Sequence, residues 1–291
     1  MLWHVVRSIR HTLERYAYAL GFWDRLRFFI HAILLFFILS LIRNNKTVLH
    51  FYPERPVPLY LTWYAACATR AKLKNGIGPR TMLFMDDTLI DQKLPEGHER
   101  WINGRCLDIR KSTVAKVYEK VFGHKLAIDP TTHTGAAVRK SDFNATHDGY
   151  IVECPTEAEK GYVYQTLVDN TISGVPYVED IRITVVGTEM PVVVLKRRPQ
   201  QYRFWSANSS VLIKEVHEVL SDDERAKVLQ FSKLLGLDFG EIDAVRDRRS
   251  HHLYLIDANS TPMSPPMRLS LKKRLEIIHR IAESFARQFL T

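Results

Sequence analysis

The sequence is poor in cysteine and has no apolar run long enough to cross a membrane. Its three cysteines lie far apart and form no C-x-x-C motif, so we expect neither a disulfide framework nor a zinc site, and a reducing compartment is the default. The longest apolar run, residues 28–42, falls short of the ~20 residues that a transmembrane helix needs. The sequence also lacks a nucleic-acid-binding signature, and no nucleic-acid partner is expected.

Positive charge is in excess and unevenly distributed. The 291 residues carry a formal net charge of +9, and residues 1–46 contribute seven basic and two acidic side chains, a net +5. The rest of the chain is mildly basic, which suits anionic ligands such as nucleotide phosphates. A hydrophobic content of 46% is ordinary for a globular enzyme, and the length allows one large domain or two to three smaller ones.

Residues 1–46 form a basic, hydrophobic extension that differs from the rest of the chain. Apolar residues recur at roughly helical spacing over residues 2–23 beside several arginines, and the apolar run follows. This pattern is typical of a basic amphipathic helix followed by an apolar segment, both of which contact an anionic membrane surface. Two alternatives stay open: a helical hairpin packed on the body of the protein, and an export signal. The expected localisation is cytoplasmic, either in solution or at the inner face of the membrane.

After residue 46 the pattern is that of an α/β protein. Short apolar stretches between turns predict strands, and apolar residues at helical spacing predict helices. We expect strands or hairpins in residues 46–53, 81–88, 135–155, 161–170, 178–196 and 238–262, and helices in 59–73, 112–122, 221–236 and 269–290. Ser112 is expected to cap the second helix and Gly123 to stop it, and Ser221 with Glu224 forms a capping box at the start of the third.

The segment 238–262 is the most informative part of the sequence. It alternates polar and apolar residues on both sides of a polar break, DRRSH, which predicts a β-hairpin. With the turn centred near residue 250, Asp243 would lie opposite Asp257, and Glu241 opposite Asn259. All four side chains would then share one face, because residues two apart point the same way along a strand.

Three carboxylates on one patch need a counter-charge. Directly opposed side chains lie about 5 Å apart at Cβ, where like charges repel. A hard divalent cation with oxygen ligands would supply the charge, and so would ion pairs with Arg182 and Lys196. The spacing alone leaves both interpretations open.

The hairpin predicted for residues 135–155 has the features of a phosphate site. Its loop carries small residues and Gly149, which lets backbone amides approach a phosphate closely. Lys140, at the end of the first strand, would place its ammonium over the same phosphates. An ordinary solvated lysine is the alternative. Arg182 and Lys196 lie on another predicted hairpin, where they would bind anions or form structural ion pairs.

Taken in order, these motifs resemble those of the ATP-grasp superfamily over about residues 105–265. LDIRK with the following helix is similar to the element before the grasp lid, and AVRKS with NATHDG to the lid hairpin and its phosphate loop. VYQTLVDN is similar to the hinge strand that meets the adenine, and VEDIRITVVG to the strand whose arginine faces the reacting phosphate. EIDAVRD followed by LIDANSTP resembles the family's metal hairpin and is the most specific match.

The resemblance implies an ATP-grasp fold of the α/β (α+β) class. A small N-terminal α/β subdomain would span residues 47–125, and a lid hairpin with its hinge residues 126–170. A C-terminal antiparallel-sheet subdomain with the metal site would span residues 171–291. Helices in residues 1–46 would precede these parts.

The resemblance also implies the residues of a nucleotide site. ATP would bind with one or two Mg²⁺ ions, with Mn²⁺ as an alternative, and the backbone of residues 165–168 would meet the adenine. The candidate nucleotide ligands are Lys111, Lys140, Asn144, His147, Gly149, Gln165, Leu167, Val168 and, toward the ribose, Asp169. The candidate metal ligands are Asp243, Asp257 and Asn259, and the candidate groups that neutralise the transferred phosphoryl group are Arg182, Lys196 and Arg203. His147 and Asp257 depart from the family's usual small lid residue and glutamate.

Carboxylate–amine ligation is the activity that the resemblance most often implies. ATP phosphorylates a carboxylate, an amine attacks the acyl phosphate, and ADP and phosphate leave, without a protein nucleophile. The alternative is a kinase acting on a small-molecule or glycan hydroxyl, since Asp257 is common in kinase branches. A binding module without turnover is a third interpretation. The carboxylate partner would be a small molecule or a glycan- or lipid-linked acid, held by residues 47–110 and the region near Arg203.

Overall fold

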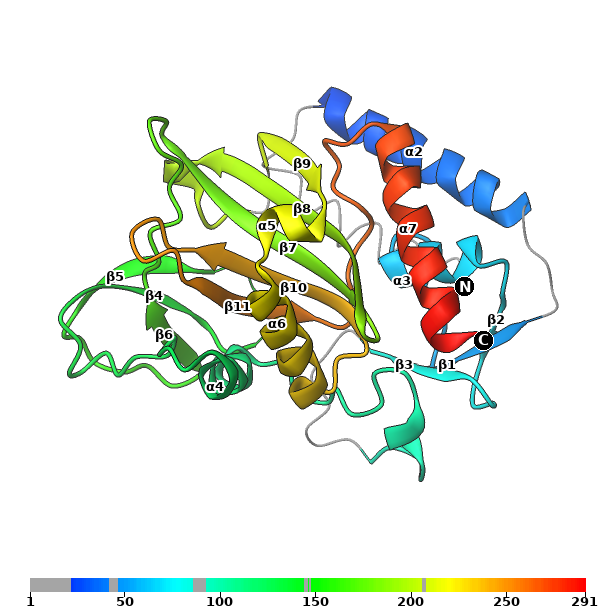
Figure 1. Ribbon diagram of the computed structural model, residues 1–291, viewed down its shortest axis with the longest axis horizontal. Helices are drawn as coiled ribbons and strands as arrows, with labels where there is room; N and C mark the ends of the chain where they lie inside the picture. The colour runs from blue at the N-terminus through cyan, green and yellow to red at the C-terminus, as the bar shows by residue number, and fades with distance from the viewer. Residues whose placement is uncertain (1–21, 42–46, 86–92, 144–145, 147, 206–207) are drawn as a thin grey trace.

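Three β-sheets organise the protein, and a computed structural model describes residues 22–41, 47–85, 93–143, 146, 148–205 and 208–291. The N-terminal sheet is parallel, in the order β2–β1–β3 (Lys72–Asn75, Val48–Pro53, Thr81–Phe84). The lid sheet is antiparallel, in the order β5–β4–β6 (Tyr150–Cys154, Gly135–Ser141, Tyr162–Thr166). The central sheet is antiparallel, in the order β11–β10–β7–β8–β9 (Leu253–Asn259, Phe239–Arg246, Tyr177–Val186, Glu189–Pro199, Ser210–Lys214). The lid sheet and the N-terminal sheet lie at opposite ends of the molecule (Figure 1).

Helices cover both faces of the central sheet. Helices α4 (Lys111–Phe122) and α6 (Asp222–Leu235) contact each other and share a hydrophobic core with one face. Helices α7 (Leu271–Phe289) and α3 (Leu61–Ala68) pack together and join the N-terminal sheet to the other face. The remaining elements are α2 (Phe22–Leu41), α5 (Val216–Val219) and the 3₁₀ turns η1 (His98–Arg100) and η2 (Gln200–Tyr202).

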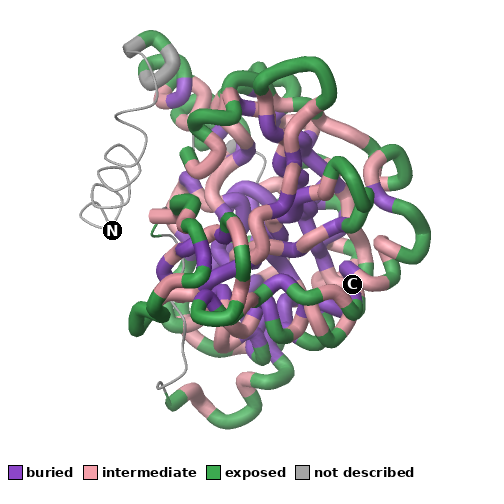
Figure 2. The backbone as a smooth tube through the Cα atoms, turned by 90° about the vertical axis from the view of Figure 1, so that its left-hand side faces the viewer, coloured by how far each residue is buried: buried purple, intermediate pink, exposed green. Residues whose placement is uncertain are grey.

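Strand β7 shows how the sequence divides the central sheet into two faces. Ile181, Ile183 and Val185 point into the core beneath α4 and α6 and are buried. Because side chains alternate along a strand, Asp180 and Arg182 point to the opposite face. Buried residues occupy the middle of the molecule, and exposed loops surround them (Figure 2). The alternation that predicted a strand therefore also collects charged side chains on one surface.

The predicted helix caps are confirmed except at Ser112. Ser221 and Glu224 form the expected capping box at the start of α6, and Gly123 ends α4 in the left-handed conformation, with φ of 78°. Helix α4 begins one residue before Ser112, whose amide and hydroxyl donate to the Asp142 carboxylate at 2.8 and 2.9 Å. The Ser112 cap was therefore a wrong prediction, because a distant carboxylate takes the hydrogen bonds of this residue.

The helix predicted for residues 59–73 is too long. Helix α3 ends at Ala68, and Arg70 has a positive φ of 64°, which turns the chain out of the helix. Residues 72–75 form β2 and pair in parallel with β1. An apolar run of this length satisfies both helix and strand patterns, and the neighbouring strand decides between them.

Helix α2, within the N-terminal extension, packs on the body of the protein. Leu35 and Leu39 are buried in the core that contains α3 and α7. Phe36 stacks on Trp63 with ring centroids 5.7 Å apart. No helix in the described ranges is long and apolar enough to cross a bilayer. The packing agrees with the packed-hairpin alternative for this helix, while residues 1–21 and 42–46 lie outside the described residues.

Asn103 ties the N-terminal half of the chain to the central sheet. Its side-chain nitrogen donates to the Phe239 carbonyl at 2.7 Å, and its Oδ1 accepts from the amides of Asp238 and Phe239 at 2.9 and 2.8 Å. We expect Asn103→Ala to lower the free energy of unfolding by about 3 kcal/mol, because it leaves buried backbone groups without partners. Urea denaturation measures this value. Asn75→Ala, at an exposed amide, is the control and should change it by less than about 0.5 kcal/mol; equal losses in both variants would contradict the prediction.

Candidate nucleotide and metal site

The candidate site lies on the hairpin of β10 and β11, whose predicted register is confirmed. Asp243 pairs with Asp257, and Glu241 pairs with Asn259, across the antiparallel ladder. Gly240 permits the close approach of the strands, because a Cβ there would lie 2.4 Å from the Asn259 carbonyl oxygen. A bulge follows directly after Asp243. The four polar residues therefore occupy the paired positions that the sequence predicted.

Arg182 and Lys196 supply the counter-charge at Asp243. Arg182 donates from Nε to Oδ1 and from Nη2 to Oδ2, both at 2.9 Å, and Lys196 Nζ donates to Oδ1 at 2.8 Å. Burial alone would raise the pKa of Asp243, but the charges and hydrogen bonds of Arg182 and Lys196 outweigh it and hold that pKa well below its usual range. Asp243 is therefore ionised and already paired in this structure.

Ion pairs, one of the two interpretations that the spacing left open, are present on the carboxylate patch. Glu241 Oε2 lies 3.1 Å from Arg182 Nη1, and burial raises the pKa of Glu241. Among the described residues, no three Asp, Glu, His or Cys side chains lie close enough to hold a metal ion. Arg182 forms salt bridges with both Glu241 and Asp243, which stand on the same face of the sheet. Glu241 therefore already has a cationic partner. The remaining oxygen ligands are two aspartates and one asparagine.

Asp257 is partly buried where Lys111 of α4 and Lys140 of the lid sheet approach the hairpin. Burial raises the pKa of Asp257, and Lys111 and Lys140 act in the opposite direction. Lys140 Nζ donates to the Ile256 carbonyl at 3.0 Å, and Lys111 Nζ donates to the Phe143 carbonyl at 2.5 Å. Burial also lowers the pKa of Lys140 to about 8. The predicted phosphate lysines therefore converge on the face of the hairpin that carries the acids.

The lid loop contacts the segment that follows β8. A Cβ on Gly149 would lie 3.1 Å from the Phe204 ring, so glycine allows this approach. The Thr146 hydroxyl donates to Asp148 at 2.9 Å, which orders the described part of the loop. The predicted ligands Asn144 and His147 lie outside the described residues.

A pocket of about 410 Å³ opens beside the hinge. Its lining includes the hinge residues Leu167, Val168 and Asp169 together with Arg203 and Arg248. Arg203 Nη2 donates to the Val168 carbonyl at 3.2 Å. The structure therefore brings three predicted nucleotide residues together in one pocket and holds Arg203 at the hinge.

Comparison with known proteins identifies the fold. Neither a protein-family model nor a curated protein matches the sequence. The ATP-grasp ligase PsnB, complexed with minimal precursor, Mg and ADP, is similar with a TM-score of 0.54 and 12% identity, covering 85% of this chain and 100% of that chain. PsnB complexed with the precursor peptide PsnA2 and AMPPNP gives the same TM-score of 0.54 with 11% identity and the same coverage, 85% and 100%. This chain has the ATP-grasp fold.

The ATP-grasp fold confirms the predicted fold class. Strands β4 and β5 form the lid hairpin that carries Lys140, and β6 leads into the hinge. Strands β10 and β11 form the predicted metal hairpin within the antiparallel central sheet. The boundaries proposed at residues 47, 126 and 171 stay predictions.

The metal ligands that the ATP-grasp resemblance predicts fit Mg²⁺ in their chemistry. Two carboxylates and one amide oxygen are hard oxygen donors of the kind that Mg²⁺ prefers. Asp257 is partly buried and forms no salt bridge with another described residue, so its charge lacks a direct partner. Asn259 Oδ1 accepts the Thr261 amide at 2.9 Å, which orients the side chain. A partly buried carboxylate without an ion pair is the observation that favours a cation here.

Asp180 is a buried acid of the central sheet that the sequence analysis missed. It lies on β7 two residues before Arg182, on the same face, and pairs with Lys196 across the ladder. Asn170 Nδ2 donates to Asp180 Oδ1 at 3.1 Å, and Arg198 bonds the other oxygen. The two-residue spacing from Arg182 is the signal that would have identified it.

Proposed function

We propose that this protein is an ATP- and Mg²⁺-dependent ligase that activates a carboxylate as an acyl phosphate for attack by an amine. One observation carries the proposal. On an ATP-grasp fold, the opposed pair Asp243 and Asp257 is flanked by Arg182 and Lys196 on the central sheet. Lys111 of α4 and Lys140 of the lid sheet approach the same pair. The similar PsnB structures contain Mg with ADP, or AMPPNP, which supports a nucleotide in the equivalent cleft.

Different parts of the chain would hold the two ends of ATP. Lys111 and Lys140 would bind the phosphates, and the lid loop with Gly149 would cover them. Residues 165–168 would meet the adenine, and Asp169 the ribose. Asp243, Asp257 and Asn259 would hold Mg²⁺ or Mn²⁺, which neutralises charge on the triphosphate when bound.

Arg182 and Lys196 would stabilise charge during phosphoryl transfer. An oxygen of the substrate carboxylate forms a bond to the γ-phosphorus while the bond to the ADP oxygen breaks, so negative charge spreads over the transferred oxygens. Two preorganised cations in a largely buried site stabilise that charge more than water does. The amine then attacks the acyl carbon, phosphate leaves, and the proton lost by the amine passes to solvent. The role of Arg203 at the reacting group stays a prediction.

Trapping with hydroxylamine tests this reaction. The full chain is incubated with ATP, MgCl₂, hydroxylamine and the small-molecule fraction of a cell extract. A ligase is expected to form ADP, free phosphate and a hydroxamate, because hydroxylamine intercepts the acyl phosphate. A phosphorylated product with ADP and no free phosphate would indicate the kinase instead. ADP formation equal to a protein-free blank would contradict both activities.

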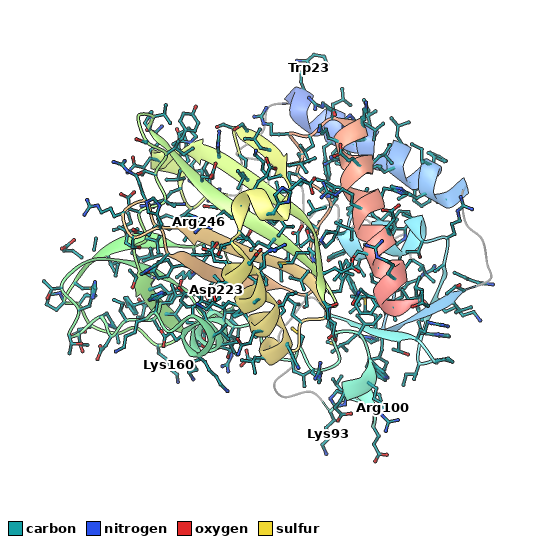
Figure 3. All side chains as sticks on the ribbon, viewed as in Figure 1. Trp23, Lys93, Arg100, Lys160, Asp223 and Arg246 are labelled. Atoms are coloured by element: carbon teal, nitrogen blue, oxygen red, sulfur yellow. The ribbon has the colours of Figure 1, made fainter. Side chains whose placement is uncertain are left out.

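An exposed apolar face on α2 supports membrane contact by the N-terminal extension. Trp23, Leu26, Ile30, Ile33 and Phe37 follow one another at intervals of three or four residues and are all exposed. Trp23 projects away from the body at the start of the helix (Figure 3). An apolar helix face within a basic extension favours an anionic lipid surface.

Replacing two residues of this face is expected to weaken vesicle binding. Ile33 and Phe37 are 54% and 58% exposed, and changing both to serine should lower the affinity for vesicles containing phosphatidylglycerol about tenfold or more, since each loses about 1.5–3 kcal/mol of burial. Cosedimentation measures the bound fraction, and Ile77→Ser, at a residue that is 54% exposed on another part of the surface, serves as the control. Equal binding of the double variant and the control would refute membrane contact through α2.

A further inference from the structure

Glu241 is a buried acid of the candidate site to which the proposed ligase reaction assigns no role. The residue lies on β10 two positions before Asp243, on the same sheet face, and is 8% exposed. Its Oε2 lies 3.1 Å from Arg182 Nη1. A carboxylate is rarely buried to this extent unless an opposite charge pairs with it, so the contact with Arg182 is the feature that any role of Glu241 has to explain.

The position of Arg182 between two acids follows from the pairing of β7 with β10. Arg182 stands directly opposite Asp243 in the ladder, and Glu241 is its diagonal neighbour, which a long side chain can reach. The guanidinium donates from Nε and Nη2 to Asp243 and presents Nη1 to Glu241. The two carboxylates therefore bind different edges of one planar group, and one contact can persist when the other is broken.

The charges of these ion pairs cancel in the structure. Arg182 and Lys196 both pair with Asp243. Arg182 also pairs with Glu241, so two cations face two acids. A metal ion at Asp243 would draw on the charge of that carboxylate and compete with both of its ion pairs. Lys196 would then turn to the phosphates, whereas Arg182 would keep Glu241 as its counter-charge.

We propose that Glu241 is a positioning residue that holds Arg182 toward the transferred phosphoryl group while Asp243 binds the metal ion. Glu241 acts through the guanidinium and forms no bond to the substrate. Without its charge, the guanidinium depends on Asp243 for charge balance and competes with the metal ion for that carboxylate. The assignment rests on the proposed function and divides the work of the two acids, because Asp243 serves the metal ion and Glu241 serves the arginine.

Metal binding by Glu241→Gln tests the proposal without turnover. The amide keeps the size of the side chain and removes its charge. In the presence of ADP, the full-length variant is expected to bind Mn²⁺ about tenfold more weakly than the wild type, the size of a coupling between residues in contact. Electron paramagnetic resonance of free Mn²⁺ measures both dissociation constants. Glu224→Gln is the matched control and should bind Mn²⁺ as the wild type does, because Glu224 pairs with Arg246 at 2.6 Å on the opposite face of β10.

A double-mutant cycle shows whether Glu241 acts through Arg182. In the hydroxylamine assay at saturating Mg²⁺, Glu241→Gln should lower kcat about 10²-fold and change the KM for ATP by less than about threefold, because the arginine is misplaced. In an Arg182→Lys background the same change should lower kcat by less than about threefold, since the fork that Glu241 holds is already absent. An equal loss of kcat in both backgrounds would overturn the inference.

A crystal structure of the wild type with Mg²⁺ and AMPPNP tests the inference without any variant. Arg182 is expected to stay within hydrogen-bond distance of Glu241 while Asp243 coordinates the metal ion. Coordination of the metal ion by Glu241 itself, or loss of its contact with Arg182, would overturn the inference and leave the proposed function intact. Failure of the wild type to bind AMPPNP, or Mn²⁺ with ADP, would overturn both.

Discussion

Asp257→Asn is expected to lower the rate of ATP-dependent turnover about 10²–10³-fold, because it removes one of the two carboxylate charges that would hold the metal at the triphosphate. The amide is nearly the same size, so packing is preserved. Burial raises the pKa of Asp257, which means that the folded state disfavours its ionised form relative to the unfolded state. Stability from this group therefore falls as pH rises through the folded pKa, and the asparagine variant should be at least as stable as the wild type in the absence of metal.

Two measurements check this expectation. Initial rates at increasing Mg²⁺ should show a weaker apparent metal affinity in Asp257→Asn, and urea denaturation should show no loss of stability. Asp223→Asn changes an exposed carboxylate on α6 (Figure 3), which pairs with Lys227. This variant should behave as the wild type. A fully active Asp257→Asn enzyme would remove the basis of the proposed function.

Arg182→Lys is expected to lower turnover about 10²–10³-fold while nucleotide binding changes little. The lysine keeps the positive charge but loses the planar fork that now contacts both oxygens of Asp243 and also Glu241. Alanine at this position is a poorer test, because it would leave the buried Glu241 without its cationic partner and Asp243 with Lys196 alone. We expect this loss to destabilise the fold by about 3–5 kcal/mol.

Arg197→Lys is the matched control for Arg182→Lys. Arg197 lies on β8 and donates to Glu179 at 2.6 Å, in a partly exposed pair. Since side chains alternate along a strand, it stands on the sheet face opposite Lys196 and the proposed cleft. Single-turnover kinetics with saturating ATP should show a slow step in Arg182→Lys and a normal rate in Arg197→Lys. Equal rates in the two variants would contradict a role for Arg182 in the chemical step.

The register of the metal hairpin could be predicted because it depends on a local pattern. Side chains along a strand repeat every two residues, so a turn near residue 250 is sufficient to place Asp243 opposite Asp257. The capping box at Ser221 and the stop at Gly123 are local in the same sense. Each of these features involves residues that are close in sequence or joined by one short turn.

Predictions failed where a distant partner competes with the local pattern. The predicted helix extended to residue 73, yet residues 72–75 form β2 because β1 offers backbone hydrogen bonds. Serine is a common helix-capping residue, yet the amide and the hydroxyl of Ser112 donate hydrogen bonds to Asp142. Asp180 was missed because the residues that hydrogen-bond to its carboxylate, Asn170 and Arg198, lie 10 and 18 positions away in the sequence. None of these partners can be identified from spacing alone.

The sequence by itself determined the strands, the turn between β10 and β11, and the side of the hairpin on which the acids stand, because strand periodicity is a property of consecutive residues. Only the tertiary structure decided which charges meet on that side. Lys196 reaches Asp243 over 47 positions of chain, and Lys140 reaches Ile256 over 116. Contacts over such separations depend on how the sheets close on one another, and that closure brings Lys111 and Lys140 to the face that carries the acids.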